Sequence, residues 1–545
     1  MKRFIFITFS FISLSISAQH KEKFSKYEYL HGKLTPLRTC FDVKLYDIYI
    51  KVEPKLKFIS GKNKITFLTT TDFQKLQLDF FLQMKIDSIV FENKSIAYKR
   101  DSNAVFVDFG KKLAKNKIEN LTVYFRGNPR IAKNAPWDGG FVWSKDSSGN
   151  DWVGLACEGL GASCWLPCKD HLSDEADSMN MHLIVPENLV GVSNGRLISE
   201  QSFGNGFKEF DWQVTNPINN YDITINVANY AHIHDIYESK VNEMQKNLSL
   251  DFYVLKDNVE TARNFLPNEV KRMLDCFELR FGAYPFWNDG YKLVETPYWG
   301  MEHQSCISYG NGYKDNRWGF DFIIVHESGH EWFGNSLTCS DPAEMWIHES
   351  FTTYSETLFL ECRFGYQTSL KYLLEQKRNI QNKVPMIGPY DVYYHGRKDN
   401  DIYYKGAWVL QSLRSSIDND SIWFIMLKNL NITFNKKNIT TSDICKSFSE
   451  KTKLNTDKFF EQYLMHAEIP ELEYKIVDRG DNLELHYRWG NTIGGFEMPI
   501  KVTLAKDLYD FISPTKSWQI IDLNFHNPDD FKIQTDRFLI NIKKL

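Results

Sequence analysis

The sequence predicts a multidomain α+β protein, in which a β domain comes first, a mainly helical domain follows and a small β domain ends the chain. Two observations support this organisation. The hydrophobic period changes from strand-type to helix-type near residue 259 and returns to strand-type near residue 468. The chain also has 545 residues, of which 43% are hydrophobic and 15% aromatic, which is enough for two or three domains that each bury a core.

The first 18 residues have the layout of a secretory signal peptide. Lys2 and Arg3 precede a short apolar run, and Ser17 and Ala18 form a small-residue exit. We therefore expect cleavage after Ala18 and export to the periplasm or the extracellular space. An uncleaved membrane anchor is the alternative, but an apolar run of about 15 residues, interrupted by Thr and Ser, is short for a bilayer-spanning helix. No later segment reaches transmembrane length.

Charge and cysteine usage argue against two classes of protein. Lys and Arg total 65 against 69 Asp and Glu, and no basic block of the kind that binds nucleic acid is present. The nine cysteines are odd in number and scattered, unlike the dense framework of a small disulfide-stabilised domain. The clustered Cys157, Cys164 and Cys168 match no usual structural zinc spacing, so we expect buried thiols with at most one bridge.

Residues 19–235 are expected to form the N-terminal β domain. Stretches such as "YDIYIKVEP" and "AVFVDFG" alternate in hydrophobicity and are rich in β-branched residues, with Asn, Gly and Asp turns between them. This alternation is typical of strands rather than helices.

Residues 236–467 are expected to form the mainly helical domain. In "NEVKRMLDCFELRFGAYPF" apolar residues recur near i, i+3, i+4, i+7 and i+11 until Gly282 and Pro285. The segments "DSIWFIMLKNL", "TSDICKSFSEKT" and "NTDKFFEQYL" are also helical in period, and each opens with a capping residue type. Alternation returns in "NLELHYRW" and "PIKVTLAK", which places a small β domain at residues 468–545.

The segment "HESGHEWFGNSLTCSDPAEMWIHES", which begins at His326, carries a candidate metal site. On a helix, His326 and His330 lie one turn apart on one face, while Glu327 projects about 100° away, beside a bound ion. The preceding "FDFIIV" is apolar, and Gly334 and Asn335 are expected to end this buried helix. Two core histidines bonded to backbone carbonyls are the alternative, but chance predicts only on the order of 0.02 such matches.

A catalytic zinc ion needs three protein ligands and an open fourth position for water. "DPAEMWIHESFTTYSETLF" is expected to form a second helix, capped by Asp341 or Ser340, that brings Glu349 toward the histidines. His348 and Glu356 are the alternative third ligands, and His348 would point about 100° away from Glu349. Two imidazoles and one carboxylate form a ligand set that is used for peptide hydrolysis.

These motifs resemble those of one peptidase family. "HESGHEWFGNSL", followed after eighteen intervening residues by Glu349, is similar to the gluzincin signature of the M1 aminopeptidases. "YWGMEHQS" resembles their exopeptidase motif Gly-x-Met-Glu-Asn, and "YYKGAWVLQSLR" resembles their Tyr-x-Lys-Gly segment. "CEGLGASCWLPCKDHLSDEADS" and "KFFEQYLMHAEIPELEY" resemble parts of their N-terminal domain and the end of their catalytic domain. The resemblance implies an N-terminal β domain, a thermolysin-like, mainly helical catalytic domain and a C-terminal β-sandwich.

The resemblance also implies catalytic roles. It implies one zinc ion per chain with three ligands, which are His326, His330 and Glu349. Glu327 would be the general base that deprotonates the attacking water, and Tyr403 would donate a hydrogen bond to the oxyanion, with Tyr404 as the alternative.

Exopeptidase action is implied by a further set of residues. Glu302 would bind the free α-amino group of a peptide, and Glu158, ten residues before Cys168, would be the second amine-binding residue. The other expected substrate-binding residues are Gly300, Met301 and His303. Two positions depart from the motif, since Trp299 stands in place of its first Gly and His303 in place of its Asn.

The sequence therefore predicts an exported zinc aminopeptidase that acts on peptides with a free N-terminus. A zinc endopeptidase is one alternative, because the same metal chemistry cleaves internal bonds, although Glu158 and Glu302 argue against it. A non-catalytic peptide-binding protein is the other, although such a protein would be expected to lose the base or a ligand, and all of them are present.

Overall fold

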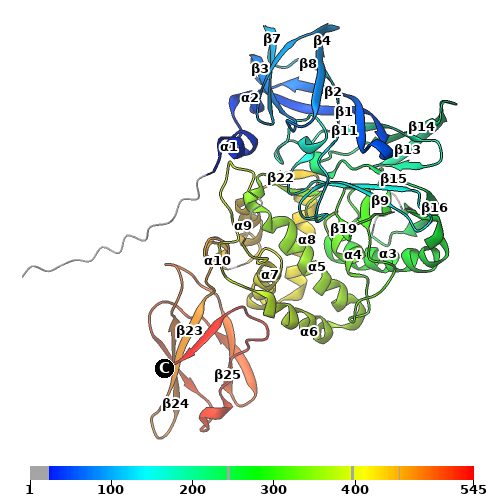
Figure 1. Ribbon diagram of the computed structural model, residues 1–545. Helices are drawn as coiled ribbons and strands as arrows, with labels where there is room; N and C mark the ends of the chain where they lie inside the picture. Colours follow the sequence, from blue (N-terminus) through cyan, green and yellow to red (C-terminus); the bar gives the residue numbers. More distant parts are fainter. Residues whose placement is uncertain (1–23, 242–245, 395–397, 453) are drawn as a thin grey trace, which may run out of the picture.

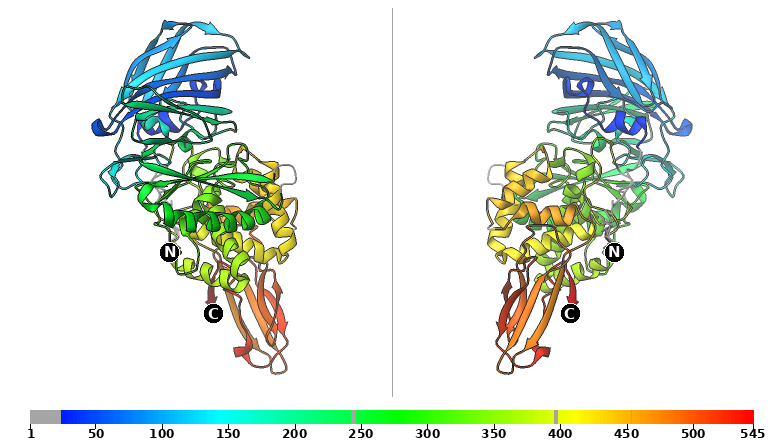
Figure 2. Two further views of the ribbon diagram at one scale, coloured as in Figure 1. Left: turned by 90° about the vertical axis from the view of Figure 1, so that its right-hand side faces the viewer. Right: turned by 90° about the vertical axis from the view of Figure 1, so that its left-hand side faces the viewer.

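The structure is a computed structural model that describes residues 24–241, 246–394, 398–452 and 454–545. The expected signal peptide lies outside these residues. Figure 1 and Figure 2 show an elongated molecule with the N-terminal β domain at one end, a mainly helical domain in the middle and a small β domain at the other end. This is the multidomain α+β organisation that the sequence predicts. No helix in the described ranges combines the length and the apolar character that a bilayer-spanning helix needs.

The N-terminal domain consists mostly of strands. Two of its sheets contain β1 (Phe41–Glu53), β2 (Phe58–Thr69), β3 (Phe73–Asp79), β4 (Lys85–Phe91), β5 (Lys94–Ser95), β6 (Ala97–Asp101), β7 (Ala104–Leu113), β8 (Ile118–Gly127), β11 (Ser178–Pro186), β13 (Arg196–Ser202) and β14 (Phe207–Val214). They pair in the orders β13-β14-β11-β1-β2-β8-β4-β5 and β3-β7-β6. Along β1, the buried Ile48, Ile50 and Val52 alternate with half-buried residues, so one face of the large sheet packs on the core.

A third sheet connects this domain to the middle one. It contains β9 (Gly140–Lys145), β10 (Asp151–Ala156), β12 (Val190–Val192) and β15 (Asn226–Ala228), in the order β12-β15-β10-β9. On β10, the indole N–H of Trp152 donates to the carbonyl of Glu295 (3.2 Å), and the carbonyl of Leu155 accepts from the hydroxyl of Tyr298 (2.7 Å). These bonds hold the loop that follows β10, and with it Glu158, against the middle domain.

The middle domain begins with a sheet of its own. Its strands are β16 (Tyr230–Glu238), β17 (Asn247–Leu255), β18 (Tyr291–Glu295), β19 (Gly300–Met301) and β20 (Ile307–Tyr309), in the order β16-β17-β18-β20-β19. The domain boundary expected between residues 235 and 236 falls inside β16, which pairs with β17 from Tyr230 to Glu238. Within the described residues β19 ends the strand order, so one side of this short strand is not paired in the sheet.

Helices make up the rest of the middle domain. They are α3 (Val259–Phe281), α4 (Phe322–Gly329), α5 (Trp346–Phe364), α6 (Tyr366–Gln376), α7 (Tyr404–Ile417), α8 (Asp420–Thr433), α9 (Thr441–Ser449) and α10 (Thr456–Leu464), with the short parallel strands β21 (Leu337–Cys339) and β22 (Lys437–Ile439) beside them. The side chain of Asn455 caps α10, as predicted, whereas Asn419 and Thr440 cap α8 and α9 one residue before the first residue of each predicted segment. One disulfide, Cys276–Cys362, joins α3 to α5, and the other seven cysteines are buried thiols.

Helix α4 is shorter than the sequence predicts. The expected end was at Gly334 and Asn335, but α4 ends at Gly329, and His330 caps it. Beyond this point, the amides of Asn335 and Ser336 bond to carbonyls five residues earlier (2.9 and 3.2 Å), so the chain continues as a wider turn. The ideal α-helical spacing therefore applies up to the second histidine and not beyond it.

The C-terminal domain is a β-sandwich. Its strands are β23 (Glu471–Asp478), β24 (Leu483–Trp489), β25 (Ile500–Ala505), β26 (Leu508–Ile512), β27 (Gln519–Leu523) and β28 (Asn541–Lys544), which form the sheets β27-β24-β23-β28 and β25-β26. Leu485 and Val502, one from each sheet, are fully buried in its core. The hydroxyl of Tyr463 on α10 donates to the carbonyl of Leu539 (2.8 Å), which ties this domain to the middle one.

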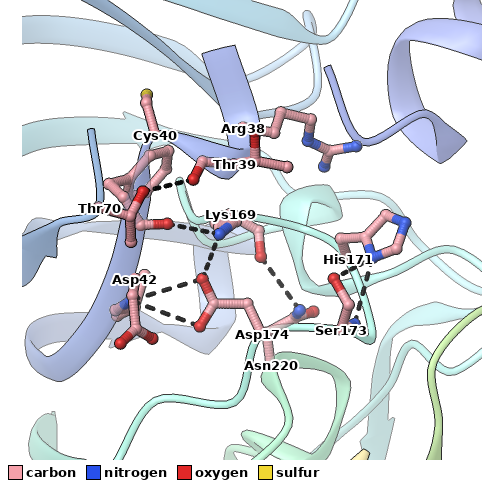
Figure 3. A network of polar contacts seen from close by, with 12 residues as sticks. Arg38, Thr39, Cys40, Asp42, Thr70, Lys169, His171, Ser173, Asp174 and Asn220 are labelled. Atoms are coloured by element: carbon pink, nitrogen blue, oxygen red, sulfur yellow. Dashed lines mark hydrogen bonds and ion pairs between the residues drawn. The ribbon is translucent and has the colours of Figure 1, made fainter. Parts of the chain in front are cut away.

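A buried polar network anchors the N-terminal helices α1 (Lys26–Gly32) and α2 (Pro36–Thr39). The fully buried guanidinium of Arg38 donates to the carbonyls of His31 and Asp170 and to the carboxylate of Asp79. Figure 3 shows Lys169 and Asp174 pointing toward each other close by, where they form an ion pair. Because Lys169 and Asp170 belong to the loop after β10, the network fixes this loop together with the start of the described chain.

Candidate metal centre

The predicted site residues meet in a cavity of about 480 Å³ between the N-terminal and middle domains. Its lining includes Trp137, Glu158, Trp299, Gly300, Met301, Glu302, Phe322, His326, Glu327, His330, Glu349, Glu356, Tyr372, Gln376, Tyr403 and Tyr404. Among the described residues that line it there are five glutamates and neither Lys nor Arg. Buried carboxylates without basic partners are unfavourable, so the composition of this cavity favours cationic ligands.

The two histidines and Glu349 have the spacing of a metal-ligand set. The Nε2 atoms of His326 and His330 lie 3.8 and 3.6 Å from Oε2 of Glu349. In a tetrahedral zinc site with bonds of about 2.0–2.1 Å, ligand atoms are separated by about 3.4 Å. The three side chains are therefore arranged to hold an ion after small adjustments. A carboxylate oxygen of Glu327 also lies within 4.8 Å of the histidine ligand atoms.

Hydrogen bonds fix the orientation of both imidazole rings. Nδ1 of His326 lies 2.7 Å from Oε1 of Glu356, and Nδ1 of His330 lies 3.0 Å from the carbonyl oxygen of Phe333. The wide turn after α4 brings this carbonyl back to the His330 ring. With Nδ1 as the donor in each case, Nε2 is left as the acceptor that a metal requires.

Glu356 is itself held by two side chains of α6. Its Oε2 accepts hydrogen bonds from the hydroxyl of Tyr372 and from Nε2 of Gln376 (3.0 Å). Although burial opposes it, the Glu356 carboxylate raises the pKa of His326 to about 10. This shift shows how strongly the carboxylate favours positive charge at that imidazole, whether from a proton or from a metal ion.

Close packing of α5 on α4 brings these groups together. Glu349, Thr352 and Glu356 follow one another at spacings of three and four residues, so they lie on one face of α5. That face meets α4 at Gly329, where an added Cβ would lie 2.7 Å from Oγ of Ser355 and 3.1 Å from Cγ2 of Thr352. Any larger residue at Gly329 would push the two helices apart.

The two alternative third ligands have other contacts. Nε2 of His348 accepts a hydrogen bond from the amide of Cys339 (2.8 Å), and His348 does not line the cavity. Glu356 reaches Nδ1 of His326, on the side of the ring away from the proposed ion. The geometry therefore places Glu349 at the ligand position and Glu356 behind it.

Tyr403 stands directly before α7 and faces Glu349. Its hydroxyl donates to Oε1 of Glu349 (3.0 Å), and burial raises its pKa well above the usual value, so it stays protonated as a donor. Helix α7 approaches α5 closely, because a Cβ on Gly406 would lie 1.8 Å from Oγ of Ser350. The Ser350 hydroxyl also donates to the carbonyl of Ile402 (2.7 Å), which fixes the residue before Tyr403. Tyr404 lines the same cavity.

Glu302 and Glu158 lie at the wall formed by β19 and the N-terminal domain. Glu302 is only 4% exposed, and its Oε1 has no hydrogen-bond partner among the described residues. Burial raises the pKa of Glu302 well above its usual value, and Glu327 and Glu349 add to the effect. A cation placed beside Glu302 would supply the missing partner. Glu158 lines the cavity from the loop after β10.

The remaining predicted substrate-binding residues fall into two groups. Gly300 and Met301 line the cavity, and a Cβ on Gly300 would lie 2.7 Å from Oε1 of Glu327, so a glycine keeps space for that carboxylate. His303 does not line the cavity. It is fully buried, its Nδ1 lies 3.1 Å from Oγ of Ser308, and burial lowers its pKa to about 3, so the ring is neutral.

Several cavity residues escaped the sequence analysis. Phe322 lies one helical turn before His326, and its ring stacks on that imidazole (5.3 Å between centroids). Tyr372 and Gln376 are four residues apart on α6, so their shared face could be inferred, but not its contact with Glu356. Trp137 comes from a distant loop of the N-terminal domain and carried no sequence signal.

Comparison with known proteins identifies the family. Residues 43–221 match the family model of the peptidase M1 N-terminal domain, and residues 301–463 match that of the peptidase family M1 domain. The chain belongs to peptidase family M1. This match places both the N-terminal β domain and the metal centre in the same family, in agreement with the resemblance of the sequence motifs.

The relatives of this M1 peptidase are distant. It is 21% identical over 435 residues to a leucyl aminopeptidase of Saccharolobus solfataricus, which covers 75% of this chain and 51% of that protein. It is 25% identical over 316 residues to an aminopeptidase B of Mus musculus, and this match covers 53% of this chain and 42% of that protein. The chain spans about half the length of the curated relatives that it matches.

A solved structure has the same fold. An M1 zinc metallopeptidase from Deinococcus radiodurans superposes with a TM-score of 0.68 at 18% identity, over 81% of this chain and 96% of that chain. The donor set of His326, His330 and Glu349 fits zinc, because it combines two neutral imidazoles with one carboxylate and leaves room for a fourth ligand.

Zinc affinity should depend on the carboxylate behind His326. In Glu356→Gln the strong acceptor at Nδ1 of His326 is lost, and we expect zinc affinity to fall by about 10–100-fold. Competition with a chromophoric chelator measures this change. Glu361→Gln is the matched control, because Glu361 lies on the same helix and faces Arg414. Equal zinc affinity in the two variants would contradict a ligand-orienting role for Glu356.

Proposed function

We propose that this M1 peptidase is a zinc aminopeptidase that removes residues one at a time from the free N-terminus of peptides. The observation that carries the proposal is the buried carboxylate of Glu302, which lies in the same cavity as the metal-ligand set and has one oxygen without a hydrogen-bond partner in the part of the chain that the structure describes. An α-ammonium group is a cation of suitable size for that position. The names of the relatives are consistent with this, since leucyl, glutamyl and B-type aminopeptidases are among them.

Each side chain has a defined task in this reaction. His326, His330 and Glu349 would hold the zinc ion, which supplies Lewis acidity toward water and the peptide carbonyl. The Glu327 carboxylate accepts the proton of the attacking water and later delivers it to the leaving amine. The Tyr403 hydroxyl donates a hydrogen bond to the oxyanion, and Glu302 with Glu158 holds the ammonium group so that only the first peptide bond reaches the centre.

The solved structures support peptide binding in this fold. A mutant of the Deinococcus radiodurans metallopeptidase is bound to the substrate Tyr-Ser-Ala in one solved structure, and a mutant of a two-domain M1 zinc metallopeptidase is bound to L-arginine in another. A zinc endopeptidase is the alternative for the present chain. It would not need two carboxylates set apart from the general base, and Glu302 and Glu158 therefore favour the aminopeptidase.

We further propose that the protein is exported. Its first 18 residues have the layout of a signal peptide, and the Cys276–Cys362 disulfide suits an oxidising compartment. Edman sequencing of the protein secreted or released from the periplasm should begin at Gln19. A native protein that begins at Met1 and stays in the cytoplasm would overturn this proposal.

Binding of the α-ammonium group by Glu302 and Glu158 predicts that the enzyme requires a free N-terminus. Acetylation removes the charge that Glu302 and Glu158 bind and adds bulk where they converge, so we expect kcat/KM to fall at least about a thousandfold. Mass spectrometry of digests should show stepwise loss of N-terminal residues from free peptides.

Two variants separate the roles of the glutamates. Glu302→Ala should raise KM steeply for free peptides and retain zinc, whereas Glu327→Gln should retain zinc and lose most turnover. If acetylated peptides yield internal fragments at rates comparable to the cleavage of free peptides, the aminopeptidase proposal is wrong and the endopeptidase alternative is supported.

The oxyanion role predicts a difference between two adjacent tyrosines. Tyr403→Phe removes a donor that acts mainly in the transition state, so we expect kcat to fall about a hundredfold or more with little change in KM. Tyr404→Phe is the matched control, because Tyr404 lines the same cavity, whereas the hydroxyl that donates to Oε1 of Glu349 belongs to Tyr403. Steady-state kinetics on one tripeptide decides between them, and an equal loss in Tyr404→Phe would show that the assignment is wrong.

A further inference from the structure

We propose that Trp299 forms the wall that selects the second residue of the peptide, the one just after the cleaved bond, and that it favours aromatic side chains there. The proposal rests on the aminopeptidase function above. Trp299 stands where the family's exopeptidase motif has glycine, so its side chain is a property of this chain. The residue lines the cavity and is 44% exposed, which is unusual for a tryptophan beside so many buried groups.

The edge of the sheet fixes the direction in which a peptide lies. Strand β19 pairs with β20 on one side, through Gly300 with Tyr309 and Met301 with Ser308, while Gly300 and Met301 also line the cavity. An extended peptide can lie along the other side of β19 as an added strand. With its ammonium group at Glu302, just after β19, the peptide runs back along the strand toward Trp299.

The position of the general base sets the register. A Cβ on Gly300 would lie 2.7 Å from Oε1 of Glu327, so the backbone at Gly300 is next to the carboxylate that activates water. The cleaved bond therefore lies beside Gly300. One residue of extended chain advances about 3.3 Å, so the next peptide residue beyond the cleaved bond reaches the level of Trp299.

Trp299 is held as a rigid flat surface. Its indole ring stacks on Phe322 with 5.3 Å between centroids and 17° between planes, and its Nε1 donates to Oδ1 of Asn311 (3.2 Å). Phe322 stacks in turn on His326 at 5.3 Å and 18°. The rings of Trp299, Phe322 and His326 thus form a column, in which the indole is backed by Phe322 and the last ring belongs to a proposed metal ligand. A fixed aromatic surface open to a cavity contacts flat aromatic side chains best, and such a contact needs no further ordering of the protein.

The test compares two substrates that differ only in the second residue. Wild-type protein should cleave Leu-Phe-amide about tenfold more efficiently, in kcat/KM, than Leu-Gly-amide. In Trp299→Ala the ratio of the two kcat/KM values should fall to nearly one. In Trp299→Phe most of the preference for Leu-Phe-amide should remain. Trp518→Ala is the matched control, because Trp518 is similarly exposed at 40% but lies in the C-terminal domain, and it should leave the ratio unchanged.

The outcomes separate the two proposals. Release of free leucine from both substrates supports the aminopeptidase function, whatever the ratio. A ratio that is the same in wild type and Trp299→Ala would overturn the role of Trp299 while leaving that function intact. Failure of the wild-type, zinc-loaded protein to release leucine from either substrate would overturn both. Zinc content measured for each variant shows whether the column from Trp299 to His326 has been disturbed.

Discussion

The contact between α4 and α5 is the constraint on which the rest of the centre depends. Gly329 allows the two helices to approach so closely that an added Cβ would lie 2.7 Å from Oγ of Ser355 and 3.1 Å from Cγ2 of Thr352. At that separation Glu349 reaches the Nε2 side of His326 and Glu356, two turns further along α5, reaches the Nδ1 side of the same ring. Helix α5 thus supplies both the proposed ligand Glu349 and the carboxylate that orients His326. A wider spacing between α4 and α5 would break both of these contacts with His326.

Other elements are arranged around this helix pair. Helix α7 docks on α5 at Gly406 and so delivers Tyr403 to Glu349, while α6 holds Glu356 through Tyr372 and Gln376. The N-terminal domain adds Glu158 from a loop that the Arg38 and Lys169 network fixes. The resulting cavity concentrates five glutamates without Lys or Arg among its described lining residues. The electrostatic cost of these carboxylates is offset when cations bind, so the composition of the cavity favours a metal ion and, under the proposed function, an ammonium group.

The sequence predicted what depends on local spacing. The order of β, helical and β domains followed from the hydrophobic period, and the cap of α10 followed from residue type, while the starts of α8 and α9 were predicted one residue too late. Four-residue spacing placed the two histidines on one face. The predicted end of α4 was wrong, because the amides of Glu331 and Trp332 bond to carbonyls three residues earlier and so end the α-helical pattern before Gly334.

What the sequence missed is tertiary contact. His303, which replaces the Asn of the family motif, was expected to bind substrate, yet the turn after β19 buries it against Ser308 instead of turning it toward the cavity. The partners of Glu356 on α6 and the stack of Trp299 on Phe322 bring together residues from separate elements. No spacing within one element contains that information. The resemblance to a family supplied roles for matching residues, but it offered nothing for Trp299, where this chain departs from the motif.

The residues that line the cavity show which domains contribute to the site. Within the described residues the lining extends from Pro136 to Tyr404 and includes nothing from the C-terminal β-sandwich, which lies at the far end of the molecule in Figure 1. That domain contacts the catalytic one at α7, where the amide of Leu539 donates to the hydroxyl oxygen of Ser412 (2.8 Å). Under the proposed function, recognition of the peptide's first residues therefore depends on the N-terminal domain and β19, whereas the β-sandwich supports the helices behind the centre, through contacts with α7, α10 and Lys377.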